Sequence, residues 1–152
     1  MTNTLKSTKR LLNQAVPFSL LLLVSANLYA QQHMSISLKG SAEVPPVITS
    51  AMATGKITVL PDHTVSGSIK TSGIAATVAH IHEAAVGQNG PPIITLSKTA
   101  NDTFVVPADA RLTDAEYRSY MAGNLYVNVH SAKYPNGEIR TQLLGKPMHL
   151  AN

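Results

Sequence analysis

Short stretches in which apolar and polar residues alternate recur along most of the chain, as in Met34–Leu38. Side chains point alternately to the two faces of a β-strand, so this alternation predicts strands with one buried face. Residues of turn composition (Gly, Pro, Asn and Asp) separate the stretches. The predicted strands cover residues 34–38, 55–60, 64–69, 78–83, 92–97, 104–106, 125–130 and 138–144.

One segment has the features of a helix instead. Thr113 and Glu116 form a capping box, Leu112 and Tyr117 are spaced as a hydrophobic staple, and Gly123 is placed to end the helix. The pattern predicts a two-turn helix over residues 114–121. Strands without other helical periods favour an all-β fold, namely an antiparallel β-sandwich or Greek-key barrel with one short helix.

Two turn signals predict hairpins. Pro61–His63 separates two predicted strands, and Pro135–Gly137 separates the last two. In the second hairpin, alternation sends an apolar set to the core and a polar set to the other face. The expected core set is Val127, Val129, Ile139 and Leu143.

The N-terminus has the pattern of a secretory signal peptide. Basic residues at positions 6, 9 and 10 precede an apolar run, and Ala26 or Ala30 ends a plausible cleavage motif. A membrane anchor is the alternative. A membrane span needs roughly 20 apolar residues, and polar residues and a proline interrupt this run before it reaches that length. We expect a signal peptide at 1–30, a domain at 31–146 and a loose tail at 147–152, in a periplasmic or secreted protein with no membrane attachment after cleavage.

Charge and cysteine content narrow the function classes. The net charge of +4 includes three basic residues of the leader, so the rest of the chain carries about +1 and nucleic-acid binding is not expected. No cysteine is present, which excludes disulfides, thiolate metal sites and thiol catalysis. Sequence signatures of common hydrolases and nucleotide-binding loops are also missing.

Histidine placement is the main chemical signal. His80 and His82 lie on alternate residues of one predicted strand, so their imidazoles share a face. His130 ends a later strand on its polar face. Copper and zinc accept such nitrogen donors. The pattern therefore predicts a three-histidine site for one copper or zinc ion.

The polar face of the last hairpin carries further candidates. We expect Asn128, Glu138 and Arg140 to surround the ligands, with Asn128 or Glu138 holding the outer nitrogen of a histidine. Glu83 should point to the opposite face. An exposed structural network without metal is the alternative interpretation. The three remaining histidines, His33, His63 and His149, are expected to be solvated.

Three motifs in this order resemble the CHRD domain, which is named from chordin and occurs in many bacterial exported proteins. They are Glu43-Val-Pro-Pro46, Ala79-His-Ile-His82 with Gly87-Gln-Asn-Gly-Pro91, and Leu125–His130 followed by Tyr134–Arg140. The resemblance covers about residues 37–144. It implies a β-rich extracellular module without an established enzymatic activity.

The chain also has a weaker likeness to copper–zinc superoxide dismutase. In that family an H-x-H-E segment, a later histidine and a late arginine resemble His80–Glu83, His130 and Arg140. The cysteine pair, bridging histidine and zinc loop of that family are missing. We therefore expect a non-enzymatic binding module with a metal or protein partner, and keep two alternatives: a metal-dependent redox enzyme, and a purely structural or adhesive domain.

Overall fold

A computed structural model describes residues 33–145, and in this part of the chain nine antiparallel strands form a single sheet with one short α-helix. The strand order is β5-β4-β8-β9-β1-β2-β3-β7-β6. The strands are β1 (His33–Lys39), β2 (Met52–Val59), β3 (Val65–Ser72), β4 (Ala76–Glu83), β5 (Pro92–Thr95), β6 (Ser97–Ala100), β7 (Thr103–Val105), β8 (Leu125–Ser131) and β9 (Ile139–Leu143). A 3₁₀ turn, η1 (Gly40–Ala42), follows β1.

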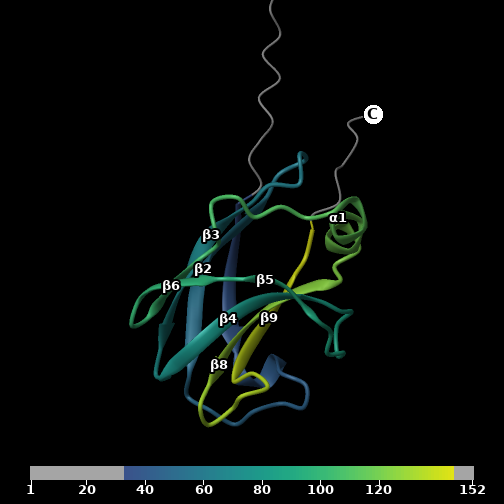
Figure 1. Ribbon diagram of the computed structural model, residues 1–152. Coiled ribbons are helices and arrows are strands. Elements are labelled where there is room, and N and C mark those ends of the chain that lie inside the picture. Colours follow the sequence, from purple (N-terminus) through teal and green to yellow (C-terminus); the bar gives the residue numbers. More distant parts are fainter. Residues whose placement is uncertain (1–32, 146–152) are drawn as a thin grey trace, which may run out of the picture.

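The sheet curls until its two ends meet. The end strands β5 and β6 are separated in the chain only by Leu96, whose amide donates to the Ala79 carbonyl at 2.9 Å. Lys98 then crosses to the Ala76 carbonyl at 2.6 Å. The result is a near-barrel (Figure 1), which confirms the predicted all-β antiparallel class. The single strand predicted over 92–97 divides in two because Leu96, 3% exposed, turns into the core.

Alternation explains the core, as the sequence predicts. Val127, Val129, Ile139 and Leu143 are each at most 1% exposed, and Val129 lies opposite Ile139 in the β8–β9 hairpin. The hairpin predicted at Pro61–His63 is also present, since β2 and β3 pair from end to end. The inner face of the curled sheet is therefore filled by aliphatic side chains.

The helix α1 (Asp114–Met121) begins where its capping box predicts. The Glu116 amide donates to Thr113 Oγ1 at 3.2 Å, and the Thr113 amide donates back to Glu116 Oε2 at 2.7 Å. His63 was expected to be solvated, and this expectation is wrong. Its side chain is only 25% exposed and stacks on Tyr117, with ring centroids 4.3 Å apart.

Loops cover the outer face of β4, β8 and β9. All seven residues of β8 are buried, although alternate side chains point away from the core. The covering segments are residues 84–91 and 132–138, together with 43–48 after η1. Polar side chains can thus lie outside the barrel core and still be shielded from solvent.

The predicted signal peptide, its cleavage sites and the tail from 147, with His149, lie outside the described residues. Among residues 33–145, no helix is long and apolar enough to cross a membrane.

Candidate metal centre

The three sequence-predicted histidines meet on the outer face of the sheet. His80 and His82 come from β4 and His130 from β8, the strand paired with β4. Each offers one ring nitrogen, and these nitrogens all lie within 4.8 Å of one another. His82 and His130 are buried at 7% and 8% exposure, and His80 is half-buried. The alternation that predicted a shared face therefore produces a compact cluster.

Backbone carbonyls fix the ring orientation of two of the histidines. His82 Nδ1 lies 2.9 Å from the Gly90 carbonyl, and His130 Nδ1 lies 2.9 Å from the Pro135 carbonyl. A carbonyl only accepts, so both Nδ1 atoms carry the proton and both Nε2 atoms keep a lone pair. The sequence suggested Asn128 or Glu138 as the group that holds the outer nitrogen of a histidine, and here the two carbonyls hold it.

The remaining ring nitrogens of the three histidines lie close together. His80 Nδ1 is 3.0 Å from His130 Nε2 and donates to it, because His130 Nε2 has no proton to give. His82 Nε2 is buried and has no hydrogen-bond partner in the described structure. The available metal donors are therefore His82 Nε2, His130 Nε2 and, once its proton moves to the other ring nitrogen, His80 Nδ1.

The cluster is electrically neutral at neutral pH. Burial and the neighbouring imidazoles of His130 and His82 lower the pKa of His80 to about 4. Burial is also the main cause that lowers the pKa values of His82 and His130. Since a metal binds the neutral ring, protons compete little for this site near pH 7.

Tyr126 and Arg140 form a layer beside His82. The Tyr126 ring stacks on His82, with centroids 4.7 Å apart and planes inclined by 7°. The Arg140 guanidinium lies 3.4 Å over the same ring, on the β9 side. Arg140 also donates to the Asn89 side chain at 3.0 Å and the Gln88 carbonyl at 2.9 Å. It thereby ties the 84–91 loop, which carries Gly90, to the sheet.

The other sequence candidates take different positions. The Glu138 carboxylate accepts from Thr49 Oγ1 at 2.7 Å and Ser131 Oγ at 2.5 Å, so these hydrogen bonds go to hydroxyls and not to the histidines. Asn128 lies opposite His80 in the β4–β8 register and interacts with His82. Glu83 accepts from Ser119 of α1.

Sequence reasoning missed two kinds of contributor. Backbone carbonyls such as those of Gly90 and Pro135 leave no signal in the residue pattern. Glu43 lies 5% exposed beside Asn128, and burial raises the pKa of its carboxyl to about 7. The Glu43-Val-Pro-Pro46 motif indicated the family in the sequence, but it did not indicate that Glu43 lies near the site.

Comparison with known proteins adds one finding. A family model described as the CHRD domain matches residues 34–143. Neither a curated protein nor a solved structure matches the chain. The matched range runs from β1 to the end of β9 and so includes all three histidines.

Proposed function

The chain belongs to the CHRD domain family, and from this premise we propose that it is an exported, non-enzymatic binding module that holds one copper or zinc ion through His80, His82 and His130. The buried lone pair of His82 Nε2 is the observation that carries the proposal. A buried polar atom without a partner costs about 1–3 kcal/mol. A metal ion would satisfy it together with the two neighbouring donors.

The donor chemistry supports copper or zinc. All three donors are imidazole nitrogens, which suit both metals, whereas magnesium and calcium prefer oxygen. Metal–nitrogen bonds of about 2.0–2.1 Å require the donors to lie roughly 3–4 Å apart. His80 Nδ1 and His130 Nε2 already lie 3.0 Å apart, so a small rearrangement would complete the site.

Three protein donors leave a fourth position for a bound ligand. The same opening would serve the redox enzyme considered above. One contact argues against that alternative: the Arg140 guanidinium stacks on Tyr126 and holds Gln88 and Asn89. An arginine engaged in this way is not free to attract a small anionic substrate to the metal.

Isothermal titration of the purified domain with Zn²⁺ and Cu²⁺ tests the proposal. We expect one ion per chain in the wild type and at least tenfold weaker binding after His80→Ala, His82→Ala or His130→Ala. His63→Ala is the matched control, because His63 stacks on Tyr117 outside the cluster and its loss should leave the affinity unchanged. Equal binding by all five proteins, or no binding by the wild type, would leave the structural or adhesive alternative.

A further inference from the structure

Three buried side-chain atoms in the described part of the chain have no hydrogen-bond partner, and they belong to neighbouring residues. They are His82 Nε2, Asn128 Oδ1 and Glu43 Oε1. Buried polar atoms are rarely left unpaired, so three in one place require a common explanation. A metal on the histidines would satisfy only the first.

Asn128 lies between the other two residues. In the structure its Nδ2 end faces the Glu43 carboxyl, where it lowers the pKa of Glu43, and its Oδ1 end faces the His82 imidazole. Gly137 leaves room for this meeting, since a Cβ atom there would lie 2.6 Å from Glu43 Oε1 and 2.7 Å from Asn128 Nδ2. The three side chains therefore form a link from the metal centre to Glu43.

The amide can present either end to either neighbour, because its oxygen and nitrogen ends have nearly the same shape. Asn128 Oδ1 and His82 Nε2 are both acceptors and cannot bond each other. Without metal, turning the amide over lets Asn128 Nδ2 donate to His82 Nε2. Asn128 Oδ1 then faces Glu43, which can complete the link only as a protonated carboxyl that donates. With metal on His82, Nδ2 is released and can turn to donate to an ionised Glu43.

We propose that Asn128 couples metal occupancy of the three-histidine site to the ionisation of Glu43, so that binding of the ion releases the Glu43 proton to solvent. This inference rests on the proposed function and adds two residues to it. The raised pKa of Glu43, caused mainly by burial, means that this carboxyl has a proton to release near pH 7.

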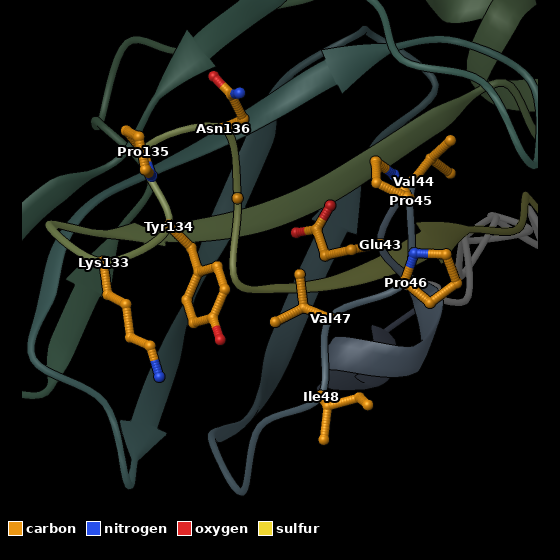
Figure 2. Close-up of a pocket in the computed structure, with 11 residues that line it drawn as sticks. Glu43, Val44, Pro45, Pro46, Val47, Ile48, Lys133, Tyr134, Pro135 and Asn136 are labelled. Atoms are coloured by element: carbon orange, nitrogen blue, oxygen red, sulfur yellow. The ribbon is translucent and has the colours of Figure 1, made fainter.

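A cavity gives this proton a route to solvent. Glu43 is the one carboxyl among the residues lining a pocket of about 480 Å³ between residues 43–48 and 133–137. Figure 2 shows its side chain pointing toward the wall that carries Tyr134, away from Pro46. The charged and titratable groups around Glu43 are Arg140 from β9, which lowers its pKa, Lys133 on the opposite pocket wall, and the His82–His130 cluster beyond Asn128.

Proton counting tests the coupling. Zn²⁺ is titrated calorimetrically into the metal-free domain in buffers of different ionisation enthalpy, and the slope gives the protons released per ion. A carboxyl of pKa about 7 is about three-quarters protonated at pH 6.5. Wild type should therefore release about 0.7 proton more than Glu43→Gln at pH 6.5, and the difference should vanish by pH 8.5. Asp109→Asn, which removes an exposed carboxylate, should match the wild type.

The outcomes separate this inference from the proposed function. If Zn²⁺ binds and Glu43→Gln releases as many protons as the wild type, the coupling is wrong while the metal site stands. If neither Zn²⁺ nor Cu²⁺ binds, the proposed function and the metal-driven release both fall.

A titration without metal tests the Asn128 link itself. Carboxyl ¹³C NMR should give Glu43 a midpoint near pH 7, and His82→Ala should lower that midpoint, because Asn128 Nδ2 is then free to donate to the carboxylate. Thermal unfolding curves check that both proteins are folded. Equal midpoints in the two folded proteins would overturn the link.

Discussion

Replacing Arg140 by methionine should loosen the metal centre without dismantling the barrel. Arg140 is 2% exposed and joins two parts of the site, because it stacks on Tyr126 and donates to the 84–91 loop. Methionine keeps most of the apolar volume beneath the loop but has no donor. The change therefore isolates the contribution of the guanidinium.

The expected loss of stability follows from these contacts. Two charge-assisted hydrogen bonds, to the Gln88 carbonyl and the Asn89 side chain, each contribute about 1.5–3 kcal/mol, and the stack on Tyr126 about 1–2 kcal/mol. Two effects offset this loss. Gln88 and Asn89 are exposed and can bind water instead, and a buried cation is removed. We expect a net destabilisation of about 2–4 kcal/mol.

The assay has a global and a local readout. Urea unfolding gives the free-energy change, and hydrogen exchange followed by NMR should show faster exchange of the loop amides near Gly90. His82 loses part of its orientation when this loop moves, because its Nδ1 proton is held by the Gly90 carbonyl. Zinc affinity should accordingly fall about 10–100-fold, as for other partners that orient a metal ligand.

Arg118→Met is the control, because Arg118 is exposed on α1 and its replacement should stay within about 0.5 kcal/mol of the wild type. If Arg140→Met also stays within that range, and the loop amides exchange as in the wild type, then Arg140 does not secure the loop and our account of His82 is wrong.

Three further predictions concern the core, the pH response and export. Val129→Ala removes a fully buried side chain and should cost about 1–3 kcal/mol in denaturant unfolding, whereas a change within 0.5 kcal/mol would invert our assignment of faces. The metal-free protein should lose stability as the pH falls from 6.5 to about 4, because the unfolded chain protonates His80 at higher pH than the folded one; His80→Gln should reduce this slope in thermal unfolding, and unchanged slopes would contradict the lowered pKa. Mass spectrometry of the exported protein should find an N-terminus at Asn27 or Gln31, and an intact Met1 would refute cleavage.

Most of the fold could be predicted because alternation and turn residues act locally. The β8–β9 hairpin shows this: Pro135–Gly137 marks its turn, and the spacing of Val127 and Val129 defines its buried face. The division of β5 from β6 could not be predicted, because Leu96 continues an apolar run and only the curl of the sheet explains its inward turn.

The candidate site was predictable only in its ligands. His80, His82 and His130 share a face by alternation, which the sequence shows directly. Their hydrogen-bond partners lie on loops that fold back over the sheet. The alternation of apolar and polar residues predicts the faces of strands but not the paths of loops. Glu138 illustrates the limit: its position on the polar face was foreseeable, but its capture by Thr49, 89 residues away in the chain, was not.

The strand order also constrains when this domain can fold. Among residues 33–145, β1 is the first strand and β9 the last, and β1 lies between β2 and β9 with Lys39 paired to Arg140. The outer edge of β1 therefore has no partner strand until the ribosome has added the residues of β9. Pairing of strands about a hundred residues apart is slow, and the chain stays open meanwhile. A polypeptide that cannot close its barrel early is one that a translocation channel, which passes unfolded chains, could still thread from end to end.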